Sequence, residues 1–386
     1  MLIGIVGAPN KGKSTLFSAI TSINVKIEDR PFTTIDPNKG IAFVTKQCVE
    51  RELGVKCNPI NSKCIDGIRY IPINVVDVAG LVEGAHEGRG MGNKFLNDIA
   101  GADALIIVID ASGKTDKEGY YCENCDPADD VEMVISEITE WIADIIKKHI
   151  SILSRTENKE QLKEILSSLK VSQTDIEDVA NKLGLTITKI NWDEDTIKKF
   201  SKALLLKAKP IIIAANKLDK VEPNRINELK ERLKDFNVIG CSAGLELAIQ
   251  RAINQGFIRI SNEKIEVLKE LTQEQRSAID YINKFLEKYK TTGVKELLNT
   301  IVFDILNYIV VYPVEDENKY TDHFGHILPD SVLVKKGTTA QELAYMIHTD
   351  LGKNMLYAID AKKKLRVQKN YVLKDNDVIK IVSSAK

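Results

Sequence analysis

The chain has 386 residues, of which 28% are charged, and a formal net charge of −1. This length is enough for two or three domains with substantial cores. The near-zero net charge provides no global field that would favour nucleic acid, so any contact with RNA must come from local patches. No apolar run approaches the length of a membrane span, and Met1 leads directly into a strand pattern. We therefore expect a cytoplasmic protein without a signal peptide or membrane contact.

The N-terminal residues predict a phosphate-binding loop. A buried-strand pattern at residues 2–6 runs directly into the motif G-x-x-x-x-G-K-[ST], which is followed by a helical pattern. The glycines of such a loop let backbone N–H groups converge on phosphate oxygens, and the helix adds its positive N-terminal end. We expect Lys13 to reach the β- and γ-phosphates and the Ser14 hydroxyl to bind Mg²⁺. The residues assigned to the nucleotide here are Gly7, Ala8, Pro9, Asn10, Lys11, Gly12, Lys13, Ser14 and Thr15.

Two further segments supply residues for the metal and the γ-phosphate. In residues 31–38, Thr34 rather than Thr33 is expected to close over Mg²⁺ when the γ-phosphate is present. A strand pattern ends in Asp77, which would hold Mg²⁺ through water, and the N–H of Gly80 would contact the γ-phosphate. The predicted metal ligands are therefore Ser14, Thr34 and Asp77.

The cysteines allow two interpretations. Cys48, Cys57 and Cys64 lie in a loop-rich stretch, and Cys122 and Cys125 form a C-x-x-C motif. Zinc sites usually pair two close C-x-x-C motifs, and the spacing of the first three cysteines is looser than that. Reduced thiols are the favoured interpretation, and metal binding stays open.

Residues 113–204 lose the buried-strand runs and carry apolar residues at three- and four-residue spacing instead. This pattern predicts an inserted antiparallel helical arm whose apolar stripes pack as core. The stripes consist of Val131, Val134, Ile135, Ile138, Ile142 and Ile145, then Leu162, Ile165, Leu166 and Leu169, then Ile176, Val179 and Leu183.

A second buried-strand pattern at residues 210–215 is followed by the tetrapeptide N-K-L-D. The Asp219 carboxylate can accept two hydrogen bonds from N1–H and N2–H₂ of guanine, and adenine does not offer these donors in that geometry. Asn216 is expected to brace the surrounding loops, and Lys217 to lay its methylene stem over the base.

A third strand pattern at residues 238–241 precedes Ser242 and Ala243, whose backbone N–H can donate to guanine O6. These motifs follow a phosphate loop in this order, which predicts GTP as the ligand. Residues 1–112 and 205–305 alternate strands with helices, the pattern of a doubly wound, mostly parallel sheet covered on both faces.

Residues 306–386 form a separate predicted unit. Strand patterns at 328–334, 356–359 and 378–382, with a threonine-capped helix from residue 338, fit a small ubiquitin-like β-grasp. A basic run here fits a solvated hairpin and an RNA-binding surface about equally. It consists of Lys353, Lys362, Lys363, Lys364, Arg366 and Lys369. His323 and His326 are interpreted as loop residues rather than ligands.

The glycine-rich run from Asp77 to Leu96 resembles the second switch of the Obg-like GTPases, and residues 31–38 resemble their first switch. The chain is most similar to the YchF-related branch, especially its archaeal members, over essentially its whole length. That resemblance implies a P-loop GTPase domain, a helical insertion at 113–204 and a C-terminal TGS domain with the β-grasp fold. YchF proper typically replaces the guanine-reading aspartate by glutamate and prefers ATP, whereas the intact Asp219 favours GTP.

The resemblance implies a GTP hydrolase that acts as a ribosome- or RNA-associated switch in translation or ribosome biogenesis. We expect a monomer, although the sequence does not determine the oligomeric state. Water would attack the γ-phosphate in line, and catalysis there is mainly positioning and charge neutralisation. Leu81 stands where Ras-like GTPases have a water-orienting glutamine, so slow intrinsic turnover is expected. The residues assigned to catalysis are Lys13, Thr34, Gly80 and Asn10.

Two groups are candidates for the catalytic role that Leu81 cannot fill. An asparagine at the position of Asn10 helps to hold K⁺ in potassium-activated relatives, with backbone carbonyls of residues 23–30 as the remaining ligands. His86 is a candidate of lower weight. The alternative functions are a guanine-nucleotide or alarmone sensor whose hydrolysis is incidental, and an ATPase like YchF proper.

Overall fold

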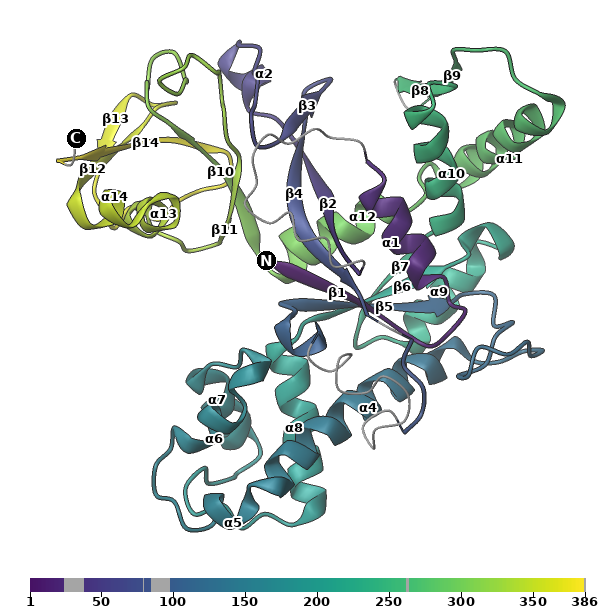
Figure 1. The fold of residues 1–386 in the computed structure, drawn as a ribbon, viewed down its shortest axis with the longest axis vertical. Helices are drawn as coiled ribbons and strands as arrows, with labels where there is room; N and C mark the ends of the chain where they lie inside the picture. Colours follow the sequence, from purple (N-terminus) through teal and green to yellow (C-terminus); the bar gives the residue numbers. More distant parts are fainter. Residues whose placement is uncertain (24–37, 79, 85–97, 262–263, 385–386) are drawn as a thin grey trace. The chain divides into compact units, whose positions relative to one another are not determined.

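The computed structural model describes residues 1–23, 38–78, 80–84, 98–261 and 264–384 (Figure 1). The chain divides into two compact units. Met1–Ser22 and Asn74–Leu297 make up most of the first unit, and Ala42–Ile73 and Leu298–Lys386 make up most of the second. This division groups the helical insertion with the phosphate loop. The domain boundaries given above remain a prediction.

A seven-stranded sheet has the order β2-β4-β1-β5-β6-β7, with β3 paired to β4. β1 is parallel to β4 and β5, and the pairs β5–β6 and β6–β7 are also parallel, whereas β3 and β4 are antiparallel. The predicted P-loop fold with a doubly wound, mostly parallel sheet is therefore confirmed. The strands are β1 (Leu2–Val6), β2 (Lys39–Gln47), β3 (Lys63–Ile65), β4 (Ile68–Asp77), β5 (Ala104–Asp110), β6 (Ile211–Asn216) and β7 (Asn237–Gly240).

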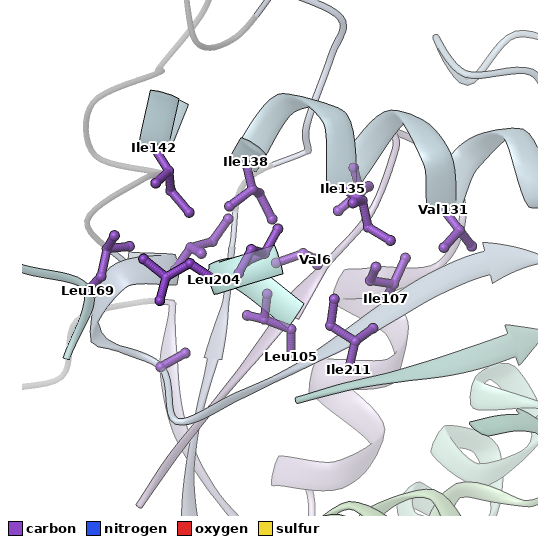
Figure 2. Close-up of a cluster of buried hydrophobic side chains, with 14 of the residues drawn as sticks. Val6, Leu105, Ile107, Val131, Ile135, Ile138, Ile142, Leu169, Leu204 and Ile211 are labelled. Atoms are coloured by element: carbon purple, nitrogen blue, oxygen red, sulfur yellow. The ribbon is translucent and has the colours of Figure 1, made fainter. Parts of the chain in front are cut away.

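The central strands β1, β5 and β6 bury both of their faces, because successive side chains point to opposite sides of a sheet and nearly all of them are buried. Leu105, Ile107 and Ile211 pack against α4 (Pro127–Lys148) and α8 (Glu194–Ala208), as Figure 2 shows. Burying one such side chain contributes roughly 1.5–3 kcal/mol. The two long helices of the insertion are therefore anchored on the sheet that carries the phosphate loop.

The other face of this sheet is covered by α1 (Lys13–Thr21) and α10 (Ala243–Asn254), which pack against each other (Figure 1). The alternate side chains of the strands, such as Ile106 and Ile212, are fully buried. Helices on both faces explain why these strands are continuous apolar runs. After the insertion the chain continues with η3 (Leu218–Lys220), α9 (Asn224–Arg232), β8 (Ile258–Ser261), β9 (Lys264–Val267), α11 (Gln273–Tyr289) and α12 (Val294–Asn299).

The apolar stripes of residues 113–204 correspond to helices, but the second stripe is interrupted. It comprises α6 (Gln161–Ile165) and η2 (Ser167–Leu169), because Leu166 leaves helical geometry and Lys170 adopts a left-handed conformation. The next helix, α7 (Gln173–Lys182), begins with a capping box and packs on α8. One short helix, α5 (Ile150–Leu153), follows α4.

The second unit contains a five-stranded sheet in the order β11-β10-β14-β12-β13. β10 is parallel to β14 and the other neighbours are antiparallel, which confirms the C-terminal β-grasp. The strand predicted at 328–334 is shorter than expected and begins at Val332, while β10 and β13 were not predicted. The elements are η4 (Thr300–Ile305), β10 (Tyr308–Val314), β11 (Val332–Lys335), α13 (Ala340–Ile347), α14 (Thr349–Asn354), β12 (Met355–Asp360), β13 (Leu365–Val367) and β14 (Asp377–Ser383), and the second unit also holds α2 (Glu50–Leu53).

Two further observations concern membrane-spanning helices and the C-x-x-C motif. Within the described ranges, no helix is both long enough and apolar enough to cross a bilayer. Cys122 and Cys125 are joined by a disulfide bond. The preference for reduced thiols was therefore wrong for this C-x-x-C pair, because the loop before α4 brings its two sulfur atoms together.

Candidate nucleotide-binding site

The parallel strands of the first unit bring their carboxyl ends to one edge of the sheet, where open α/β sheets bind ligands. The phosphate loop follows β1, Asp77 ends β4 and Asp110 ends β5. Asn216 ends β6, and Ser242 follows β7. Sequence motifs separated by more than two hundred residues therefore meet at this edge.

The phosphate loop depends on two glycines with positive φ. At Gly7 (φ +148°) a Cβ would lie 2.5 Å from the carbonyl oxygen of Val108. At Gly12 (φ +94°) it would lie 2.2 Å from Nδ2 of Asn216. The helix α1 then begins at Lys13 without a side-chain cap. Its first backbone N–H groups are thus available to an anion.

Lys13 points back into this loop. Its Nζ donates to the carbonyl oxygen of Ala8 at 2.8 Å, and the side chain is 7% exposed. Burial lowers the pKa of Lys13 to about 8, and the nearby Asp77 carboxylate opposes that shift. A Cβ on Gly80 would lie 3.4 Å from Lys13 Nζ, so the D-x-x-G segment approaches the phosphate loop. Lys13 and Gly80 are therefore neighbours at the carboxyl edge of the sheet.

Asp77 and Ser14 form a group of oxygens beside Lys13. Burial raises the pKa of Asp77, whereas a hydrogen bond from Ser14 and the charge of Lys13 act in the opposite direction. Oδ1 of Asp77 is buried and has no hydrogen-bond partner within the described part of the chain. Hard oxygen donors of this kind fit Mg²⁺. Thr34, the third predicted metal ligand, lies outside the described residues.

The Asn216 amide links the phosphate loop to the segment after β7. Its Nδ2 donates to the carbonyl oxygen of Lys11 at 2.9 Å, and its Oδ1 accepts from the N–H of Ala243 at 3.0 Å. The Asp219 carboxylate accepts a 2.5 Å hydrogen bond from the Ser242 hydroxyl. Asn216 and Asp219 of the first guanine motif and Ser242 and Ala243 of the second thus form one connected group with the phosphate loop.

Lys217 has a left-handed backbone (φ +65°) and extends to the phosphate loop. Its Nζ donates to Oδ2 of Asp110 at 2.8 Å and to the carbonyl oxygen of Asn10 at 3.1 Å. Burial raises the pKa of Asp110, but hydrogen bonds from Lys217 and Ser112 outweigh it and hold that pKa below its ordinary value. Asp110 ends a buried strand as Asp77 does, and that signal was not used in the sequence analysis.

A buried ion pair ties the phosphate loop to α4 and was missed from sequence. Lys11 is fully buried, and its Nζ lies 2.8 Å from Oδ2 of Asp130. The same Nζ donates to the carbonyl oxygen of Thr115 at 2.8 Å. Burial raises the pKa of Asp130 to about 6, and Lys11 opposes that shift. The side chain of Lys11 therefore faces the insertion, so only its backbone is left to face a nucleotide.

The residues considered for catalysis or for its missing group are Leu81, Asn10 and His86, and the structure describes the first two. Leu81 is 1% exposed and packs in the core below the phosphate loop, with its N–H donating to Gly7 at 3.2 Å. Nδ2 of Asn10 donates to the carbonyl oxygen of Gly119 at 3.0 Å. His86 lies outside the described residues. At Leu81 the chain therefore presents an apolar group that is turned away from the loop surface.

Comparison with protein families assigns nearly the whole chain. A family model described as a 50S ribosome-binding GTPase matches residues 2–217. The G4 motif-containing domain of the YGR210-like Obg-like GTPases matches residues 214–316, and the TGS domain matches residues 324–383.

Individual proteins with similar sequences or structures support the same family assignment. The chain is 52% identical to an uncharacterised GTP-binding protein of Methanocaldococcus jannaschii, over 100% of both chains. It is 32% identical to the ribosome-binding ATPase YchF of Mycoplasma genitalium, over 97% of both. The crystal structure of a GTP-binding protein from Pyrococcus horikoshii OT3 superposes with a TM-score of 0.79 at 35% identity, covering 99% of this chain and 100% of that one.

The Asn216 bridge makes a direct prediction. Asn216→Ala removes both hydrogen bonds and leaves the buried N–H of Ala243 without its partner. We expect a loss of roughly 2–4 kcal/mol in the free energy of unfolding, measured by urea denaturation. Nucleotide affinity should fall at least about tenfold, because phosphate and base loops lose their common support.

The matched control is Asn224→Ala. Asn224 is exposed on α9, and its amide bonds the Glu228 side chain at 3.0 Å. This substitution should change stability by no more than about 0.5 kcal/mol. Equal unfolding free energies and equal nucleotide affinities for the two variants would contradict the role given to Asn216.

Proposed function

Because this chain belongs to the Obg-like GTPase family, in its YchF-related branch, we propose that it binds GTP with Mg²⁺ and hydrolyses it to GDP and phosphate. The family establishes a nucleotide-binding P-loop protein. Its members carry names of both GTP-binding proteins and ATPases, so the choice of base has to be argued from this chain's own residues. The observation that carries the proposal is the connection of Asp219 and Asn216 to the phosphate loop.

Guanine selection is proposed to reside in Asp219. Its carboxylate is oriented by the Ser242 hydroxyl at 2.5 Å, and its backbone oxygen accepts from the Tyr281 hydroxyl at 3.2 Å. A carboxylate held in this way accepts hydrogen bonds from two guanine donors. Each such bond to a charged group is worth about 1.5–3 kcal/mol. ATP would leave this half-buried carboxylate without its two donors, which is the stronger source of discrimination.

The phosphate end is proposed to work by positioning and charge. Lys13 would exchange its bond to Ala8 for one to the β- and γ-phosphates, and the first N–H groups of α1 would cradle the same oxygens. Ser14 and the buried Oδ1 of Asp77 would hold Mg²⁺, directly and through water, and Thr34 would complete the set. The bound Mg²⁺ would neutralise charge on the phosphate oxygens. Gly80 would give its N–H to the γ-phosphate.

Slow intrinsic turnover is proposed because Leu81 is buried and carries no group that can orient water. The missing charge stabilisation would come from a monovalent cation beside the phosphates, with Oδ1 of Asn10 as one ligand. The Nδ2 of the same amide donates to Gly119 at 3.0 Å, which fixes the direction of the side chain. The other proposed ligands, carbonyls from residues 23–30, fall almost entirely outside the described part of the chain.

The ribosome is the proposed partner. A family model of ribosome-binding GTPases covers residues 2–217, and the Mycoplasma relative is named a ribosome-binding ATPase. The buried Leu81 also favours a second function, a guanine-nucleotide or alarmone sensor whose hydrolysis is incidental. A sensor needs occupancy of the site rather than turnover, so hydrolysis rates separate the two functions.

Guanine selection is tested by Asp219→Asn. The amide can donate to O2 of xanthine, whereas it cannot accept from both guanine donors. We expect GTP affinity to fall at least about a hundredfold while xanthosine triphosphate becomes the preferred ligand. Competition of GTP and of xanthosine triphosphate against a fluorescent nucleotide analogue measures the two affinities.

Asp235→Asn is the matched control, since Asp235 is an exposed carboxylate of the same unit. It should keep the GTP preference of the parent protein. If Asp219→Asn also keeps that preference, guanine is not read by this residue.

Hydrolysis is tested by multiple-turnover assays in K⁺ and in Na⁺ at matched ionic strength, with and without ribosomes. We expect the rate to be about tenfold or more higher in K⁺, since preorganised positive charge is usually the largest catalytic contribution. Asn10→Ala should remove this difference. Ribosomes should raise the rate further.

Asn124→Ala serves as control, because Asn124 is also an exposed asparagine with a positive φ (+60°). It should keep the potassium dependence. Equal rates in the two salts would exclude the cation mechanism, and a rate near zero under every condition would favour the sensor.

A further inference from the structure

Outside the nucleotide site, one cluster of side chains has the composition of a metal centre. Cys48 follows β2, Glu50 begins α2, Cys57 lies in the loop after α2, and Cys64 lies on β3. All four belong to the second unit. Their ligand atoms lie within 4.8 Å of one another, and no other group of this kind is found among the described residues. We call these four residues the cysteine cluster.

The distances in the cysteine cluster agree with a tetrahedral zinc ion. Zn–S bonds are about 2.3 Å and Zn–O bonds about 2.0–2.2 Å, so the edges of the tetrahedron are about 3.8 Å between two sulfurs and about 3.5 Å between sulfur and oxygen. The Sγ atoms of Cys48 and Cys57 are 3.9 Å apart. Sγ of Cys64 is 3.3 Å from Oε1 of Glu50. An ion would therefore fit among them with only small movements.

The local backbone holds these donors in place. The N–H of Cys57 donates to Oε2 of Glu50 at 2.9 Å, which orients the carboxylate and leaves Oε1 toward Cys64. Gly54 (φ +66°) ends α2 and turns the chain back toward the cluster. The N–H of Cys48 donates to Gly67 at 2.8 Å. The donors therefore come from three segments with defined backbone conformations, as in structural metal sites.

The surroundings supply positive charge. Arg69 lies directly opposite Cys64 in the antiparallel pairing of β3 and β4, and facing residues of such a pair point to the same side. Its side chain is fully buried, and its Nε has no hydrogen-bond partner among the residues described. Three thiolates and one carboxylate around Zn²⁺ carry a net charge of −2. A buried guanidinium beside them offsets part of this charge.

The donor set also selects the metal. Thiolates bind Zn²⁺ and other thiophilic ions, whereas Mg²⁺ and Ca²⁺ require oxygen ligands. Cys48 and Cys57 are 2% and 9% exposed, so water has little access to these two sulfurs. Four protein ligands without an open position are typical of structural rather than catalytic zinc. From these observations we propose that Cys48, Glu50, Cys57 and Cys64 bind one structural Zn²⁺.

The consequence concerns the loop between Cys57 and Cys64. The N–H groups of Asn58 and Ile60 donate to Ile327 and Pro329 at 3.1 and 2.9 Å. Residues 58–60 are thereby paired with the segment that leads into β11, all within the second unit. Zinc bound by Cys57 and Cys64 fixes both ends of this loop and so holds that pairing. The site is independent of GTP and of the proposed hydrolysis.

The test uses the full-length protein, stripped of metal under reducing conditions and titrated with Zn²⁺ or Co²⁺. We expect one zinc per chain by elemental analysis. Co²⁺ should give the intense thiolate charge-transfer and tetrahedral ligand-field absorption bands. Cys64→Ser and Cys57→Ser should each weaken metal binding by more than about a hundredfold, and Glu50→Gln by at least about tenfold. Cys64 is partly exposed, so its variant is the one best suited to remain folded.

Two controls remove cysteines elsewhere, Cys122→Ser with Cys125→Ser, and Cys241→Ser. Both should retain one zinc per chain. The proposal is overturned if the parent protein takes up no stoichiometric metal, if Cys64→Ser keeps full affinity, or if zinc is lost with Cys122 and Cys125. An unchanged affinity in Glu50→Gln would overturn the four-ligand set. A Cys48–Cys57 disulfide that resists the reducing agent in the metal-free protein would also overturn the proposed zinc site.

Discussion

Gly12 has no Cβ, and the amide of Asn216 takes up that space, 2.2 Å from where a Cβ would stand. From there the amide donates to the phosphate loop at Lys11 and accepts from Ala243. The loops for phosphate and for guanine are therefore aligned by one buried side chain at the end of β6. Nucleotide recognition needs both loops in register, because a displacement of about 1 Å is costly at such sites. A glycine at position 12 and an asparagine at position 216 therefore depend on each other.

A second constraint connects this site to the helical insertion. Lys11 is buried against Asp130 of α4, and α4 and α8 share a core with the sheet. A buried ion pair adds little net stability but is expensive to break on one side. It fixes the phosphate loop relative to α4. The insertion therefore helps to support the phosphate loop, and we expect substitutions in α4 to alter nucleotide binding.

The sequence predicted the features that depend on local pattern: the phosphate loop after β1, the guanine motif after β6, the helical period of α4 and the capped helix α13. It missed the features that depend on contacts between distant segments. Asp130 is 119 residues from its partner Lys11, and Arg69 meets Cys64 only because β3 and β4 pair. The cysteines were spaced too widely to indicate a site, since loops and a strand pairing bring them together. Leu81 was recognised as unable to orient water, but its burial required the fold.

The central claim is that this chain reads guanine rather than adenine, although named relatives include ATPases. The most direct measurement is the competition of unlabelled GTP and ATP for the wild-type protein in the presence of Mg²⁺. Two hydrogen bonds to the Asp219 carboxylate predict that GTP binds at least about a hundredfold more tightly than ATP. Equal affinities, or a preference for ATP, would contradict this account.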